Sequence, residues 1–139
     1  MSTILESVRQ VQHVRALIVR ADAELAARAA AGGVSAAERF AQRTRIGSMR
    51  HDDARLTARL RAEVCDGDPA LARRFDRLML LVDEVVVLEM EAEADPSDRM
   101  RGAMARQAAG ELEAEAAALR ERVAAMPPRP ALRLVDLVG

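Results

Sequence analysis

The sequence predicts an all-α protein, an antiparallel (up-down) bundle of four long helices with a short apolar C-terminal tail. Three observations lead to this prediction. Apolar residues recur every three or four positions over most of the 139-residue chain, which is the spacing of one helical face. Glycine, proline and capping residues divide the chain into four segments of similar length. No stretch of useful length alternates apolar and polar residues as a strand does.

The first helix is expected to begin after Thr3 and to end at Gly32-Gly33. Thr3 and Glu6 have the spacing of a capping box, in which each side chain bonds the backbone N–H of the other residue. The apolar stripe that follows is Ile4, Val8, Val11, Val14, Ile18, Ala21 and Leu25. The glycine pair then ends the helix, because glycine tolerates the left-handed conformation found there.

The second helix opens at Ser35, where Ser35 and Glu38 repeat the capping-box spacing, and runs toward Cys65. Its apolar pattern slips in phase near Gly47. One helical face carries Ile46, Met49, Leu56, Leu60 and Val64, whereas Phe40 points nearly opposite. Glycine costs about 1 kcal/mol relative to alanine inside a helix, and Gly-Ser pairs are known kink sites. We therefore expect a kink near Gly47.

Aspartate and proline mark the starts of the last two helices. Asp68 is suited to cap the third helix, with Pro69 at its first position. The same Asp-Pro pair at 95–96 predicts the start of a fourth helix that runs to about Met126.

The sequence PPRP at 127–130 ends that helix. The chain is therefore expected to comprise a helical bundle over residues 1–126 and a proline-led tail over residues 127–139. The apolar tail residues are Leu132, Leu134, Val135 and Leu137, with Val138 beside them. The tail either folds back on its own bundle or docks on a partner, and the sequence favours neither.

Polar residues within the apolar stripes predict ion pairs in the core. Arg15 and Asp22 fall inside the stripe of the first helix, and Asp53 falls near the centre of the stripe of the second. An unpaired buried carboxylate is costly. A hairpin centred between positions 33 and 34 places position 15 opposite about 52 and position 22 opposite about 45. We expect the cross-helix pairs Arg15–Asp53 and Asp22–Arg45.

A second charge pattern links the second and third helices. In a hairpin centred at Gly67, the acidic second half of the third helix would meet the basic half of the second. The acidic residues are Glu84, Glu89, Glu91 and Glu93, and the basic residues are Arg43, Arg45 and Arg50. Such exposed pairs contribute only about 0–1 kcal/mol each, so they would fix register more than stability.

The third helix is apolar on too many sides for a helix at the edge of a monomeric bundle. Leu80 and Val87 fall on the side opposite its main stripe of Leu71, Phe75, Leu78, Val82 and Val85. A helix that is apolar all round is either central or shared between chains. We therefore expect a second chain to cover Leu80 and Val87, and the protein to form a homodimer.

Composition argues against several functional classes. The net charge is −1, whereas a nucleic-acid-binding domain is usually basic. All 21 basic residues are arginine, which together with abundant alanine is typical of a GC-rich bacterial genome. The longest apolar run is interrupted by Asp83 and Glu84 and is too short to span a bilayer. We expect neither a nucleic-acid partner nor a membrane partner.

The sequence also lacks a set of residues suited to catalysis or metal binding. Cys65 is the only cysteine, and His13 and His51 are the only histidines. Neither histidine belongs to a di-iron bundle motif, so no metal, cofactor or catalytic residue is predicted. A lone cysteine and the lack of a signal-peptide pattern favour the cytoplasm.

Two functional classes remain after these exclusions. The first is a small cytoplasmic protein-interaction module, such as a chaperone, adaptor or assembly factor. The second is a small all-α enzyme or ligand-binding bundle that uses an arginine–carboxylate cluster in its core. If Arg15, Arg45 and Asp53 line an open cavity, the second class is favoured; if they pair across a helix seam, the first is.

Overall fold

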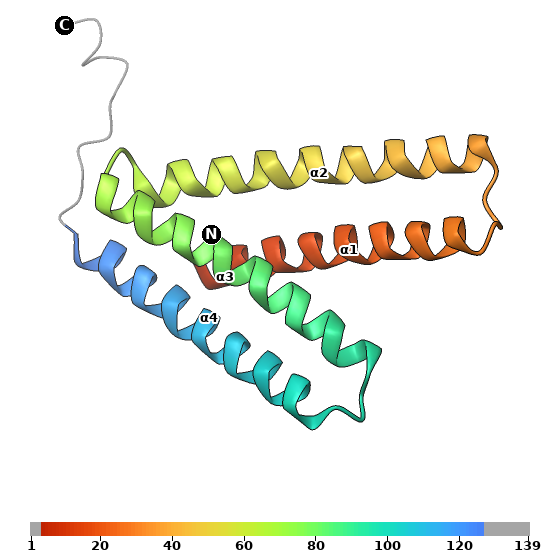
Figure 1. Ribbon diagram of the computed structural model, residues 1–139. Coiled ribbons are helices and arrows are strands. Elements are labelled where there is room, and N and C mark those ends of the chain that lie inside the picture. The colour runs from red at the N-terminus through yellow and green to blue at the C-terminus, as the bar shows by residue number, and fades with distance from the viewer. Residues whose placement is uncertain (1–3, 127–139) are drawn as a thin grey trace, which may run out of the picture.

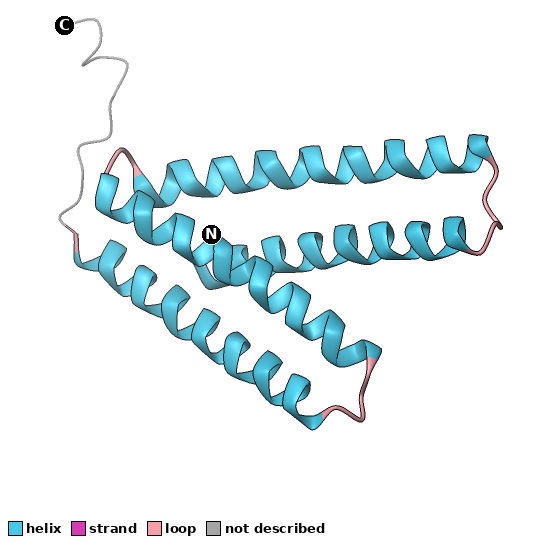
Figure 2. Ribbon diagram, viewed as in Figure 1, coloured by secondary structure: helices cyan, strands magenta, loops and turns pink. Residues whose placement is uncertain are grey.

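The computed structural model describes residues 4–126, and it shows the predicted all-α fold. Four long helices follow one another in antiparallel order (Figure 1). They are α1 (Ile4–Ala30), α2 (Ala36–Cys65), α3 (Pro69–Ala94) and α4 (Arg99–Ala125). Only short loops join them, and no strand occurs within residues 4–126 (Figure 2). Residues 1–3, with Thr3, and the apolar tail at 127–139 lie outside the described residues.

The capping chemistry explains where the helices begin. The Ser35 side chain accepts from the Glu38 N–H at 3.1 Å at the start of α2. Asp68 accepts from two backbone N–H groups at the start of α3, and Pro69 occupies the first turn, as predicted. Both aspartate and serine satisfy N–H groups that have no partner within the helix.

The start of α4 differs from the prediction. The helix is capped by Asp98, whose side chain accepts from the Arg101 N–H at 3.1 Å, and not by Asp95. Asp95 instead ends α3, and its side chain accepts from the Ser97 hydroxyl at 2.6 Å. The Asp-Pro pair thus forms the turn between the helices, and the next aspartate caps α4.

The kink expected near Gly47 is not confirmed, because α2 is one uninterrupted helix from Ala36 to Cys65. The phase slip has another cause. Leu60 and Val64 lie in the main core, but Phe40, earlier in α2, is 75% exposed. The apolar pattern therefore changes where α2 leaves the core, and Phe40 faces outward on a continuous helix.

The main core lies at one end of the molecule. It is built from the N-terminal part of α1, the C-terminal part of α2, most of α3 and much of α4, with Phe75 and Val82 fully buried within it. Buried Ala108 and Ala116 on α4 allow it to approach α3 closely. Away from this core the α1/α2 and α3/α4 hairpins diverge, so their loops lie far apart (Figure 1).

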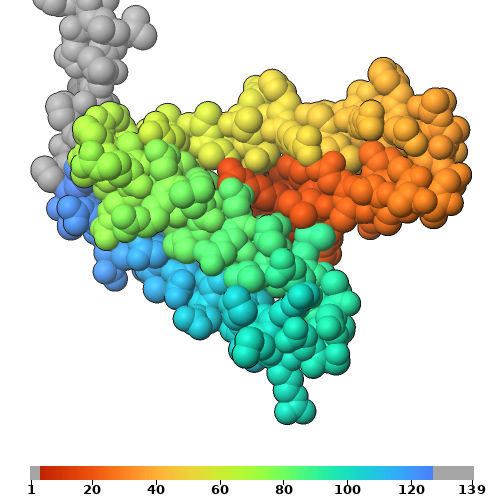
Figure 3. Space-filling model, in the orientation of Figure 1, coloured from red at the N-terminus to blue at the C-terminus, as the bar shows by residue number. Residues whose placement is uncertain are grey.

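The divergence leaves part of the first hairpin uncovered. Residues 17–50, here called the arm, contribute no side chain to the main core and project from it as a pair of helices (Figure 3), with Arg20 near the base of the arm bound to Glu93 of α3. Only Ile18 and Ile46 are buried among the arm residues. Within residues 4–126, no helix has an apolar stretch long enough to cross a membrane.

Candidate functional site

Arg15 occupies the junction of three helices. Its Nε donates to Asp53 Oδ1 on α2 at 3.2 Å, and its Nη1 donates to Asp83 Oδ1 on α3 at 2.8 Å. Its Nη2 donates to the Thr57 hydroxyl at 3.2 Å, and the Met79 carbonyl accepts from Nη1 at 3.4 Å. The structure thus brings Arg15 and Asp53 together as the hairpin register predicts, and it adds Asp83 as a second carboxylate.

This junction is arranged to hold helices together. The Arg15 and Asp53 side chains are only 16% and 18% exposed. All three guanidinium nitrogens of Arg15 already donate to protein oxygens. Because an arginine has five N–H groups in a fixed planar fork, little of its donor capacity is left for a ligand. Arg15 and Asp53 pair across a seam, which favours a structural role for them.

The predicted Asp22–Arg45 pair does not form. Asp22 instead accepts from Arg50 of α2. The reason is that the two residues lie on opposite sides of the α1–α2 seam: Asp22 lines one groove of the arm and Arg45 lines the other. Leu25, which lines both grooves, marks the seam between them.

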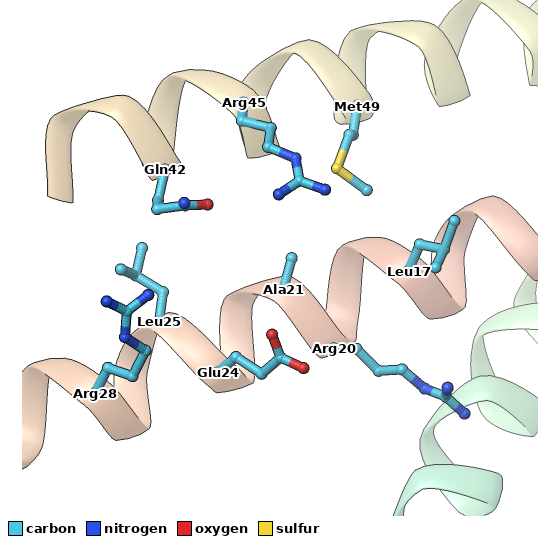
Figure 4. A pocket seen from close by; sticks show the side chains of 9 residues that line it. All are labelled: Leu17, Arg20, Ala21, Glu24, Leu25, Arg28, Gln42, Arg45 and Met49. Atoms are coloured by element: carbon cyan, nitrogen blue, oxygen red, sulfur yellow. The ribbon is translucent and has the colours of Figure 1, made fainter. Parts of the chain in front are cut away.

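The first groove of the arm contains Arg45. Figure 4 shows the Arg45 and Met49 side chains projecting from α2 toward α1. The groove is lined by Leu17, Arg20, Ala21, Glu24, Leu25, Arg28, Gln42, Arg45 and Met49, and encloses about 500 Å³. It combines arginines with a few apolar side chains, and Arg45 forms no ion pair with the described residues.

The second groove, here called the arginine groove, lies on the other side of the seam and encloses about 530 Å³. Its walls are Asp22, Leu25, Ala26, Ala29, Arg39, Arg43, Ile46 and Arg50. Small and apolar side chains of α1 and buried Ile46 face three arginines of α2. Among the described residues, Arg39 and Arg43 have no carboxylate partner, so this groove suits an acidic, partly apolar surface.

The outer side of α3 carries the two apolar residues singled out in the sequence. Leu80 is 70% exposed and Val87 is 47% exposed. In the sequence of α3, Leu80 lies between the core residues Met79 and Val82, and Val87 follows the core residue Val85. The tail residues Leu132, Leu134, Val135 and Leu137 lie outside the described residues.

The acidic half of α3 does not meet the basic half of α2 within the chain, contrary to expectation. Its carboxylates reach α1 instead: Glu93 accepts from Arg20 at 2.8 Å, and Asp83 accepts from Arg15. The two hairpins diverge, and α3 crosses α1 and does not continue alongside α2. Within residues 4–126, Glu84 and Glu91 are exposed and have no ion-pair partner.

The remaining titratable residues show no catalytic arrangement. Burial raises the pKa of the Cys65 thiol, which lies within the core. His51 is exposed on α2, and His13 lines a shallow groove between α1 and Glu89 of α3. Over the described residues, no three histidine, cysteine or acidic side chains gather as metal ligands would.

Comparison of the chain with family models, with curated proteins and with solved structures finds no match. The sequence reasoning missed the exposure of Met100 and Met104 on α4 and the arginine groove. The spacing of Arg39, Arg43, Ile46 and Arg50, at i, i+4, i+7 and i+11, contained the signal for the groove.

Proposed function

We propose that the protein acts through protein–protein contact, as a small helical interaction module of the bacterial cytoplasm such as a chaperone, adaptor or assembly factor. The observation that carries this proposal is the arm. It projects from the core, presents two grooves, and exposes Phe40 near its tip. Large apolar side chains and arginine are the residue types that interfaces favour over ordinary surface.

The rival proposal, a small enzyme or ligand-binding bundle, loses its central residue. It requires the Arg15 guanidinium to face an open cavity and to bind an anion. Arg15 instead donates to Asp53, Asp83 and Thr57. The arginines with spare N–H donors lie on the outer surface of the arm. Small-molecule sites are usually concave and bury most of the ligand, so this open surface suits a protein partner better than a small molecule.

Site-specific photo-crosslinking tests the proposal. A photoreactive phenylalanine derivative replaces Phe40 on the arm or, as a matched control, Arg122 on the exposed side of α4. In extracts of the native host we expect discrete adducts from position 40 and none from position 122. Adding Arg43→Glu, which alters the neighbouring groove, should reduce the adduct.

The mass of the adduct identifies the partner. A mass of twice the chain indicates a second copy, and any other discrete mass indicates a different protein. Adducts that are equally abundant from both positions, or that do not respond to Arg43→Glu, would contradict a specific interaction site on the arm.

A further inference from the structure

Two helical stripes with matching spacing and opposite charge lie exposed on the chain, and among their charged residues only Arg50, which binds Asp22, has an ion-pair partner within residues 4–126. The arginine stripe of α2 is Arg43, Gly47, Arg50 and Ala54, and the acidic stripe of α3 is Leu80, Glu84, Val87 and Glu91. Each stripe alternates charged and uncharged residues at i, i+4, i+7 and i+11, and so lies on one face of its helix. All eight residues are exposed.

We infer that these stripes bind one another between two copies of the chain and form a two-fold dimer. This inference rests on the proposed function and names its partner. Residues 39–50 contain four arginines and no carboxylate, whereas residues 83–95 contain six carboxylates and no arginine. Such a difference favours specific pairing, because complementary charges meet and the alternative self-contacts repel.

If the two stripes run antiparallel, each arginine of one stripe lies opposite a glutamate of the other. With Arg43 opposite Glu91, Arg50 falls opposite Glu84, because both pairs are seven residues apart. In this register Val87 faces Gly47 and Leu80 faces Ala54. A side chain added at Gly47 would meet no atom within 4 Å, so space for Val87 exists there. The two apolar residues of α3 thus meet the two smallest residues of the arginine stripe.

The same faces of α2 and α3 already form an arginine–aspartate pair within the chain, near the turn that joins the two helices. Arg61 continues the arginine stripe toward the core, and Asp76 continues the acidic stripe. Arg61 Nε donates to Asp76 Oδ1 at 3.0 Å within the chain. Beyond this pair the hairpins diverge, and the two faces separate. A second copy would extend a contact that the chain itself begins.

The second copy is a better occupant than the chain's own α3. Arg15 and Arg20 of α1 bind Asp83 and Glu93, so α3 is held against α1 at two points. Closing the gap between α2 and α3 within one chain would break both ion pairs. In a two-fold dimer each copy keeps these pairs and offers both stripes, so the contact occurs twice. Two contacts are needed, since one short helix pair is small for a stable interface.

Charge exchange tests the inference. Arg43→Glu and Glu91→Arg each place like charges opposite one another twice per dimer, and each should weaken self-association about a hundredfold. Mixed in equal amounts, the two variants should form a heterodimer of wild-type affinity, because both contacts are then complementary. Arg59→Glu, an exposed arginine on the opposite side of α2, is the matched control and should leave the dimer unchanged.

Light scattering and sedimentation equilibrium over a concentration series give the mass, and circular dichroism checks that each variant is helical. A wild-type mass that stays monomeric at all concentrations overturns the inference. So does failure of the mixture to restore dimers. A monomer that still gives a discrete adduct of another mass from position 40 would overturn this inference and leave the proposed function standing. A monomer with no adduct would overturn both.

Discussion

Arg15 on α1 and Asp53 on α2 form an ion pair, with Nε and Oδ1 3.2 Å apart, beside the point where the arm leaves the core. The same guanidinium also binds Asp83 on α3. One side chain therefore ties the arm to both neighbouring helices. The ion pair is mostly shielded from solvent, so removing one partner leaves the other partly desolvated and without its counter-charge.

We predict that Arg15→Met lowers the free energy of unfolding by about 2–3 kcal/mol. Methionine keeps an unbranched apolar stem but removes every donor to Asp53, Asp83 and Thr57. Urea unfolding followed by circular dichroism measures the change. In a double-mutant cycle, Arg15→Met with Asp53→Ala should cost at least about 1 kcal/mol less than the sum of the single changes.

The pair Arg9–Glu113 offers a control for this prediction. It joins α1 to α4 at 3.4 Å, but both side chains are largely exposed. Arg9→Met should therefore change stability by less than about 1 kcal/mol. Equal effects of Arg9→Met and Arg15→Met would show that the junction has no special importance.

The two phenylalanines make a matched pair. Phe75 is fully buried in the core, whereas Phe40 is exposed on the arm. Phe75→Ala should cost about 3–5 kcal/mol, because it leaves a cavity among close-packed side chains. Phe40→Ala should change stability by no more than about 0.5 kcal/mol. Denaturation midpoints of the two variants test this, and a large loss from Phe40→Ala would place Phe40 in a folded interface of the isolated protein.

The helix bounds were the most predictable feature, because capping is local. Ser35 and Asp68 cap the helices that their sequences indicate, and the two-helix register brings Arg15 near Asp53. The partner of Asp22 was not predictable in this way. A hairpin register gives the position of a residue along the α1–α2 seam, but it does not say on which side of the seam the side chain lies. Arg45 lies on the side opposite Asp22.

The divergence of the hairpins has no local signal. It depends on where α3 crosses α1, which the long-range pairs Arg15–Asp83 and Arg20–Glu93 help to fix. Close packing of α3 on the alanines of α4 adds a further constraint. In an ideal bundle α2 and α3 pack along their whole length, and the predicted contacts between the basic half of α2 and the acidic half of α3 assume this packing. The crossing of α3 over α1 prevents these contacts. The grooves of the arm are a consequence of this crossing.

Glycines inside α2 and α4 offer a test of helix continuity. Gly47 and Gly110 lie within regular helices, and an added side chain would meet no atom within 4 Å at either position. Gly47→Ala and Gly110→Ala should each raise the free energy of unfolding by about 0.5–1 kcal/mol, because alanine restricts the unfolded chain and favours the helix. A decrease from Gly47→Ala alone, measured in urea, would show that α2 bends at this residue.

The Arg61–Asp76 pair predicts a dependence of stability on pH. Hydrogen bonds from Arg61, at 3.0 Å and 3.2 Å, hold the pKa of Asp76 below its usual value. A carboxyl group with a lowered pKa in the folded state stabilises the fold above its unfolded pKa of about 3.9. This contribution is lost as the pH falls through the folded pKa.

Asp76→Asn removes that contribution. The variant should be less stable than the wild type at about pH 7, and the two stabilities should converge as the pH falls below the lowered pKa of Asp76 in the folded state. Because both side chains are exposed, the difference at neutral pH will be small, and added salt should reduce it further. Urea unfolding of both proteins across this pH range measures the difference. A difference that stays constant with pH would assign the effect of Asp76→Asn to packing and not to charge.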